Sequence, residues 1–376
     1  MAQIQPQQQI SKTQIEQTYT STEQKLLIGG LERLLLFQQT GTLRPQSLQL
    51  APEDNCQMDC VWCSTKYRLH EYTQTVDNPA KVIIGEKKAK ADYIPFDDII
   101  KTVDALMAVG PLKTVELTGA GDPTLYRDRE SGEDINELIS YLHDDIGLEV
   151  GMITNGVGLT RLVKQEQLDK LSWLRVSLAV FDPQNFHGNN DGKSNEQYVE
   201  RMPDLPDHIT GKMGFSYVWG PYSKLEVLAK IADYAKDHQV DFVRIVPDCL
   251  DAPRQAEYRD KILPIVADFN KDIGREVLFF QAKRYDVHSS CRIGFIKPFL
   301  NADGYFYHCS AVPLYNQGFT PHWRMGHMSE VDKIWSAENI MKGFDTSKCE
   351  YGKCFYYDQN ALLDTIKKEG VHKNFI

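Results

Sequence analysis

Residues 47–63 read SLQLAPEDNCQMDCVWC, a short apolar strand followed by three cysteines in eight positions. Cys56, Cys60 and Cys63 have the spacing CX3CX2C. Three thiolates on one loop can hold three irons of a [4Fe–4S] cubane and leave its fourth iron open. A structural zinc site is the alternative; it needs a fourth ligand, for which His70 is the only close candidate.

Apolar strands and amphipathic helices alternate on the C-terminal side of this stretch. Near-continuous runs of Val, Ile and Leu between helices predict parallel strands that are buried on both faces. Six such units fit an open (β/α)6 barrel, although a doubly wound sheet has the same periodicity. Strands are expected at 47–51, 114–118, 149–154, 174–180, 213–219 and 241–247, the last of the series, and helices at 95–109, 135–142, 166–171, 224–238 and 255–271.

The chain divides into three parts by pattern and composition. Residues 1–45 hold a tail (1–21) and a helix (22–38) for which Thr22 is a suitable N-cap. Residues 46–275 hold the α/β series, in which 64–94 form a long connection typical of a lid or binding segment. Residues 276–376 are richer in aromatics and predict a small α+β domain, with a hairpin over 295–308 that turns at Asp303-Gly304 and one helix over 329–341.

Composition excludes several classes of protein. The 376 residues include 42 Lys and Arg against 52 Asp and Glu, a net charge of −10, which argues against general nucleic-acid binding. No stretch approaches the roughly 20 apolar residues of a membrane span. The first residues lack the features of a signal peptide. We therefore expect a cytoplasmic protein with no membrane partner, whose eight cysteines stay reduced.

The cysteine motif, with Trp62 just before its third cysteine, resembles that of the radical S-adenosylmethionine (radical SAM) superfamily. The resemblance implies a partial (β/α)6 barrel and a [4Fe–4S] cluster whose open iron is chelated by S-adenosylmethionine (SAM). It implies reductive cleavage of SAM to a 5′-deoxyadenosyl radical that abstracts a substrate hydrogen. An external one-electron reductant of the flavodoxin or ferredoxin type is implied as a partner, and Trp62 as part of the cofactor site.

The turn after the second strand of the series is similar to another motif of this superfamily. Gly119, Ala120, Gly121 and Asp122 stand where members have a Gly-Gly-Glu-like turn, and Asp122 replaces the commoner Glu. By this resemblance the carbonyls and the acid bind the methionine ammonium, and glycines let the backbone approach a ligand closely. An ordinary glycine-rich turn is the alternative.

Two more polar residues end predicted strands. Asn155 lies in ITNGVGL and Ser177 in VSLAVFD, where members of the superfamily bind the cofactor, at Ser177 its carboxylate or ribose. Both residues could instead satisfy local backbone groups. The cation that would bind the SAM carboxylate is not set by these motifs, and Lys193 is one candidate. The C-terminal rim of a β/α barrel is where chemistry is built.

A second cysteine set lies near the C-terminus. Cys291, Cys309, Cys349 and Cys354, together with Gly304 and the segment RMGHMSEVDKIW, resemble the SPASM/twitch extensions of the superfamily. Four thiolates fit a fully ligated auxiliary [4Fe–4S] cluster. A structural zinc site is the alternative, since four thiolates also suit zinc.

The resemblance implies an oxidoreductase of the dehydrogenase type or an epimerase acting on a small polar, sugar- or aminocyclitol-like substrate. A maturase that crosslinks or epimerises a peptide is the alternative; residues 1–45 are too few for the leader-binding domain such enzymes often carry. A non-catalytic iron–sulfur electron-transfer protein is the alternative of another class. Cys249 follows the sixth strand and could return a hydrogen atom in an epimerase, unless it is a small buried hydrophobe. Arg244, Asp248 and Tyr217 are candidates for substrate binding.

Overall fold

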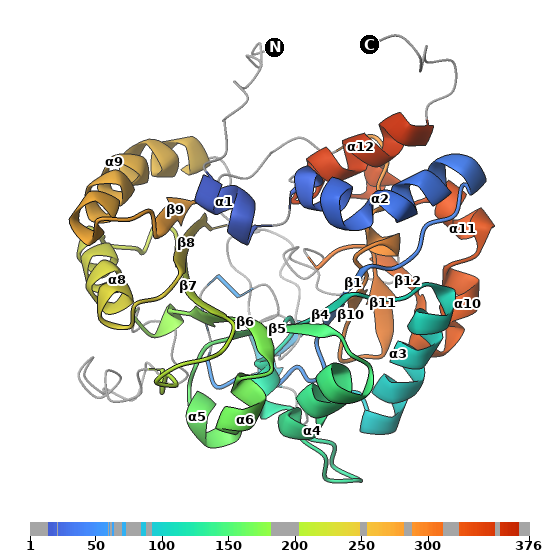
Figure 1. Ribbon diagram of the computed structural model, residues 1–376, viewed down its shortest axis with the longest axis horizontal. Coiled ribbons are helices and arrows are strands. Elements are labelled where there is room, and N and C mark those ends of the chain that lie inside the picture. Colours follow the sequence, from blue (N-terminus) through green and yellow to red (C-terminus); the bar gives the residue numbers. More distant parts are fainter. Residues whose placement is uncertain are drawn as a thin grey trace.

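A computed structural model describes residues 14–20, 22–58, 60, 62–63, 92–181, 203–248, 254–281, 288–310, 323–349 and 354–367, with the backbone alone at 70–72, 84–87 and 180. Figure 1 shows a strongly curved sheet with helices along its outer side.

The described strands are β1 (Ser47–Leu50), β2 (His70–Tyr72), β3 (Ile84–Lys87), β4 (Thr114–Leu117), β5 (Glu149–Thr154), β6 (Leu171–Ser177), β7 (Lys212–Trp219), β8 (Phe242–Pro247), β9 (Leu278–Phe280), β10 (Phe299–Leu300), β11 (Tyr305–Tyr307) and β12 (Arg324–His327). The described helices are α1 (Gln14–Tyr19), α2 (Glu23–Thr40), α3 (Phe96–Val109), α4 (Ile135–Ser140), α5 (Leu159–Leu162), α6 (Gln165–Leu168), α8 (Leu225–Asp237), α9 (Gln255–Ile273), α10 (Val331–Ile334), α11 (Ala337–Lys342) and α12 (Tyr357–Lys367).

One ten-stranded sheet has the order β12-β11-β10-β1-β4-β5-β6-β7-β8-β9, and β2 and β3 form a separate pair. The pairs from β1 through β4 to β9 are parallel. Helices α3, α4, α8 and α9 cover the outer side, where the buried residues of the strands meet them (Figure 1). The expected α/β class with a parallel sheet is therefore confirmed, in a form consistent with a partial barrel.

Some elements differ from the sequence-based expectation. The fourth strand of the series spans 171–177 rather than 174–180. The expected strand at 241–247 is not the last of the series, because β9 pairs parallel to β8 beyond it. The expected helix over 135–142 is α4 followed by a π-helical turn at 141–145. The expected single helix over 329–341 is a 3₁₀ turn at 328–330 followed by α10 and α11.

The C-terminal strands continue the main sheet. Strand β10 pairs parallel to β1, with Gln49 opposite Phe299 and Leu50 opposite Leu300. Strand β11 then turns back antiparallel on β10, as the Asp303-Gly304 turn predicts. The last described helix, α12, packs beside α2 (Figure 1). Strands on both sides of residue 276 thus belong to one sheet.

Part of the predicted N-terminal tail is a docked helix. Thr22 caps α2 as expected, by accepting a hydrogen bond from the Lys25 backbone N–H. Residues 14–19, however, form α1, so the expectation of a tail is wrong for this segment. Ile15 is buried in one cluster with Phe242 and Phe279, and the Tyr19 ring stacks on Phe242 with centroids 4.3 Å apart. The reason is that Phe242, which begins β8, and Phe279 of β9 present aromatic rings that α1 covers.

Replacing Ile15 with alanine should lower the free energy of unfolding by about 2–3 kcal/mol, since deleting buried methylenes leaves a cavity. Ile28→Ala on α2 is the matched control, because Ile28 is 86% exposed and should change stability by less than about 0.5 kcal/mol. Urea unfolding of the full chain, followed by circular dichroism, measures both. Equal effects at the two positions would contradict the docking of α1.

Candidate functional site

The loop after β1 brings three thiols, none of them in a disulfide, to the C-terminal rim of the sheet. Cys56, Cys60 and Cys63 are all half-buried. The loop turns back on itself, because the Cys63 N–H donates to the Cys60 carbonyl at 2.9 Å and the Met58 N–H to the Cys56 sulfur at 3.4 Å. Burial is the main cause that raises the pKa of the Cys56 thiol to about 12, and the negative charge of Asp122 adds to the shift. Three thiols on one short loop fit the donor set of an iron–sulfur cluster with one open iron.

The turn after β4 packs directly on this cysteine loop. The Asp122 N–H donates to the Asn55 carbonyl at 2.8 Å, and a Cβ at Gly121 would lie 2.2 Å from that same oxygen. Gly119 has a φ of 127°, and its Cβ would lie 2.7 Å from Ala51. Both glycines therefore give room to the chain's own β1 segment, a role that the sequence-based interpretation, close approach to a ligand, did not include.

The Asp122 carboxylate ties this turn to the end of β5. It is 2% exposed and accepts hydrogen bonds from the Thr124 N–H at 3.1 Å and hydroxyl at 2.7 Å. It also accepts from the Thr154 hydroxyl at 2.9 Å and the Asn155 N–H at 2.6 Å. These donors belong to the protein itself, so Asp122 has a supporting role in addition to the predicted one toward SAM.

Asn155 completes a ring of contacts by returning to the cysteine loop. Its Nδ2 donates to Gln57 Oε1 at 2.9 Å and lies 3.5 Å from the Cys56 sulfur. Its Oδ1 accepts from the Val157 N–H at 2.8 Å, which fixes the side chain's orientation. Hydrogen bonds to a cysteine sulfur tune the properties of a bound cluster. The predicted cofactor residue Asn155 thus lies beside the predicted cluster ligand Cys56.

Trp62 connects the cysteine loop to the far strands of the rim. Its ring stacks on Tyr222 with centroids 5.4 Å apart and an interplanar angle of 19°. The Tyr222 hydroxyl donates to Asp248 Oδ2 at 3.0 Å, just beyond β8. Ser177 ends β6, in register with Ser216 of β7. Tyr222 was missed because a tyrosine in a polar loop gives no local signal of its stacking partner.

Two other predicted residues lie on the neighbouring strands β7 and β8. Tyr217 is buried, and its hydroxyl donates to Ser223 Oγ at 3.2 Å. Arg244 of β8 lies opposite Ser216 of β7 on the inner face of the sheet. The predicted hydrogen donor Cys249 and the candidate cation Lys193 lie outside the described residues, as does the side chain of His70.

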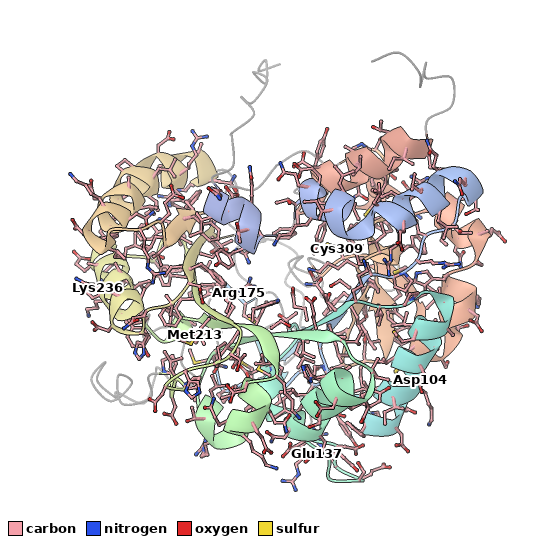
Figure 2. The ribbon with its side chains drawn as sticks, in the orientation of Figure 1. Asp104, Glu137, Arg175, Met213, Lys236 and Cys309 are labelled. Carbon is pink, nitrogen blue, oxygen red and sulfur yellow. The ribbon has the colours of Figure 1, made fainter. Side chains whose placement is uncertain are left out.

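The second cysteine set lines one cavity. Cys291, Cys309 and the pair Cys349 and Cys354 come from three stretches of the chain between β9 and α12, and all four line this cavity. The rest of the lining is largely apolar and includes Trp323, Phe344, Phe355 and Tyr356. Figure 2 shows Cys309 in the part of the molecule that holds the C-terminal strands and helices. Four thiols outside disulfides in an apolar cavity fit the donor set of a fully ligated cluster.

An asparagine lies beside this set as well. Asn360 of α12 is 1% exposed, and its Nδ2 lies 3.5 Å from the Cys291 sulfur. Its Oδ1 accepts from the backbone N–H groups of Arg292 at 2.9 Å and Ile293 at 3.1 Å. Sequence reasoning missed Asn360, which lies 69 residues from Cys291 and has no motif around it.

An apolar cluster lies between the two cysteine sites. Ala51 and Ala120 belong to it on the side of the first site, and Trp323 and Phe344 on the side of the second. Phe299 of β10 and Tyr307 of β11 complete it. The two sites are therefore parts of one packed structure.

In the described ranges no group of three His, Cys, Asp or Glu side chains is close enough to bind one metal ion. Separately, no helix in those ranges is both long and apolar enough to cross a membrane.

Comparisons with known proteins give a family match and a curated relative. A family model described as Radical SAM superfamily matches residues 52–235. GTP 3′,8-cyclase of Aeromonas hydrophila is 26% identical over 199 residues, which are 52% of this chain and 48% of that protein. The chain thus matches about half the length of this curated relative.

Two solved structures share the fold at 14% identity. Streptococcus suis SuiB bound to the precursor peptide SuiA has a TM-score of 0.51, over 92% of this chain and 75% of that one. Native anSMEcpe with bound AdoMet and Cp18Cys peptide has a TM-score of 0.53, over 86% of this chain and 96% of that one.

The segment that the family model matches contains all three cysteines of the first site and the turns that hold them. Residues 52–235 therefore belong to the radical SAM superfamily.

Proposed function

We propose that the chain is a radical SAM enzyme that oxidises or epimerises a small polar substrate. The observation that carries this proposal is the ring of contacts that fixes the cysteine loop at the rim, from Asn55 to Asp122, on to Asn155 and back to Cys56. Such a rim is where β/α barrels build their active sites. When bound there, a [4Fe–4S] cluster and SAM supply the one-electron chemistry that removes a substrate hydrogen.

The protein's residues have separate tasks in this proposal. Cys56, Cys60 and Cys63 hold the cluster. The turn at 119–122 and the residues Asn155 and Ser177 bind SAM, and Trp62, stacked on Tyr222, closes one side of the site. A reductant of the flavodoxin or ferredoxin type delivers the electron. An electron-transfer protein without catalysis would not need the SAM-binding turn in contact with the cysteine loop.

Cys291, Cys309, Cys349 and Cys354 hold an auxiliary [4Fe–4S] cluster in this proposal. The shared, largely apolar cavity that the four thiols line supports it. When bound there, such a cluster would supply an electron acceptor for oxidation of the substrate.

A peptide substrate is the second candidate. Both structures compared above have a peptide in their descriptions, SuiA and Cp18Cys, and each shares the fold over most of this chain. A nucleotide is a further small polar substrate to test, since the curated relative is named a GTP cyclase. We place oxidation of a small substrate slightly ahead, because an auxiliary cluster can serve directly as the electron acceptor.

The chain should bind about eight irons after anaerobic reconstitution, four for each predicted cubane. Changing Cys56, Cys60 and Cys63 together to alanine should leave about four irons and abolish SAM cleavage. Iron and zinc analysis with Mössbauer spectroscopy measures this. Stoichiometric zinc alongside about four irons would overturn the auxiliary cluster and leave the first site intact.

Asp122→Asn should weaken SAM binding about ten- to a hundredfold at unchanged iron content, because a buried charge-assisted hydrogen bond contributes about 1.5–3 kcal/mol. Thr154→Val is the matched control: it removes one donor to Asp122 but keeps the carboxylate, so it should lower stability by about 1 kcal/mol and leave SAM affinity nearly unchanged. Calorimetry measures both affinities. An unchanged dissociation constant in Asp122→Asn would restrict Asp122 to its supporting role.

Cys249→Ala separates epimerisation from oxidation. An epimerase using this thiol should incorporate solvent deuterium into its product in deuterated water, and the variant should still cleave SAM but form no epimer. A dehydrogenase should tolerate the change and yield a product two electrons more oxidised. Mass spectrometry of the product distinguishes the two, and full epimer formation by Cys249→Ala would refute the donor role.

A further inference from the structure

The inner face of the curved sheet carries charged side chains from several strands. By register, Gln49 of β1 lies opposite Glu116 of β4, and Arg175 of β6 lies opposite Gly214 of β7. Lys297, which precedes β10, reaches the same face and ion-pairs with Glu116, with Nζ 3.4 Å from Oε2. Figure 2 shows Arg175 on the inner side of the sheet, whereas Asp104, Glu137 and Lys236 lie on the outer helices.

Glu116 is already satisfied by its neighbours. Its Oε1 accepts from Gln49 Nε2 at 2.7 Å and its Oε2 is paired with Lys297. Burial acts to raise the pKa of Glu116, but the charges of Lys297 and then Arg175 hold it below its usual value. One carboxylate is therefore shared by two cations.

Arg175 has no acceptor of its own in this arrangement. Its Nε is shielded from solvent and donates to no partner, and in the described ranges no carboxylate forms an ion pair with it. Burial lowers its pKa, and Glu116 counters this only through its charge. The guanidinium carbon lies 5.7 Å from the centroid of the Trp173 ring, which lies across Gly151. Buried donors of this kind are normally hydrogen-bonded, so the position calls for an acceptor.

A second unpaired polar atom lies on the same face. Gln49 Oε1 is also buried without a partner, while its amide nitrogen is committed to Glu116. Arg175 thus has an unpaired donor and Gln49 an unpaired acceptor on the same face of the sheet. A ligand there would be expected to carry an anionic group and a hydroxyl or amine.

We infer that Arg175 binds an oxyanion of the substrate, a carboxylate or a phosphate, on the inner face of the sheet. The planar guanidinium matches both groups in a bidentate manner. Arg175 lies two residues before Ser177, about 7 Å along the strand and below the rim, so a substrate held there extends toward the cysteine loop. This inference rests on the proposed function and names its substrate class.

The carboxylate of SAM is the rival source of the same chemistry. Arg175 would recognise the oxyanion of the substrate and the carboxylate of SAM in the same way. The experiment therefore separates these two sources by loading the protein with SAM before the probe is added. A purely structural role is the other reading, in which Arg175 serves only to balance the charge of Glu116.

The test uses reconstituted, SAM-loaded protein and two probes, inorganic phosphate and malonate, in isothermal calorimetry at constant ionic strength. Wild-type protein should bind at least one probe saturably, and the preferred probe indicates a phosphate- or a carboxylate-bearing substrate. Arg175→Gln should bind that probe at least tenfold more weakly, with iron content and SAM affinity unchanged. Arg254→Gln, a half-exposed arginine paired with Glu257, is the control and should bind the probe as wild type does.

Three results would overturn the inference. One is the absence of saturable binding of either probe to wild-type protein. Another is a tenfold loss of SAM affinity in Arg175→Gln, which would assign Arg175 to the SAM carboxylate. The third is equal probe affinity in wild type and variant. If Arg175→Gln does not fold, Arg175→Lys is used instead, because it keeps the charge but lacks the bidentate guanidinium. The same tenfold criterion applies to it.

Failure of the proposed function is recognised separately. A chain that binds iron and SAM but no anion contradicts only the inference on Arg175. A chain that does not cleave SAM contradicts the proposed function, and the anion titration then runs on the protein as purified to decide the role of Arg175 alone.

Discussion

The contact between Gly121 and the backbone at Asn55 is the constraint on which the first site depends. A Cβ at this position would overlap the Asn55 carbonyl, so the β4 turn can lie on the cysteine loop only without a side chain there. The Asp122 N–H then donates to the Asn55 carbonyl. The Asp122 carboxylate accepts from the Asn155 N–H, just beyond the end of β5. Parallel pairing of β1, β4 and β5 brings these C-terminal ends to one rim.

Strand β1 connects this site to the second one. It pairs with β4 on one side and with β10 on the other, and β10 leads through β11 to Cys309. The apolar cluster around Phe299 and Tyr307 fills the space between the two cysteine sets. Sites built on the helices and strands of a fold are held more precisely than sites on loops. The separation of the two sites is therefore set by sheet geometry.

The two faces of the sheet have different physical roles. The outer face is apolar and packs on helices, and this burial supplies most of the stability. The inner face carries Glu116, Arg175 and Lys297, whose burial costs free energy unless each finds a partner. Glu116 and Lys297 compensate each other, whereas Arg175 is left with donors to spare. Such incomplete pairing is typical of functional positions.

The two cysteine sites also share a local arrangement. In each, a buried asparagine has its oxygen fixed by backbone N–H groups and its nitrogen 3.5 Å from a cysteine sulfur, Asn155 at Cys56 and Asn360 at Cys291. Neither asparagine can rotate away without breaking those backbone bonds. Both sulfurs therefore have a pre-oriented amide donor.

The sequence by itself determined the strands of the α/β series, the CX3CX2C loop and the hairpin at Asp303-Gly304, because hydrophobic runs and turn residues act locally. It did not determine β9 or the docking of α1, since both depend on partners distant along the chain. Nor did it show that Gly121 contacts Asn55, that Asn360 contacts Cys291, or that Arg175 is left without a carboxylate. Only the tertiary structure decided these points, because a strand's neighbours and the face a residue occupies are set by non-local pairing, which no local pattern encodes.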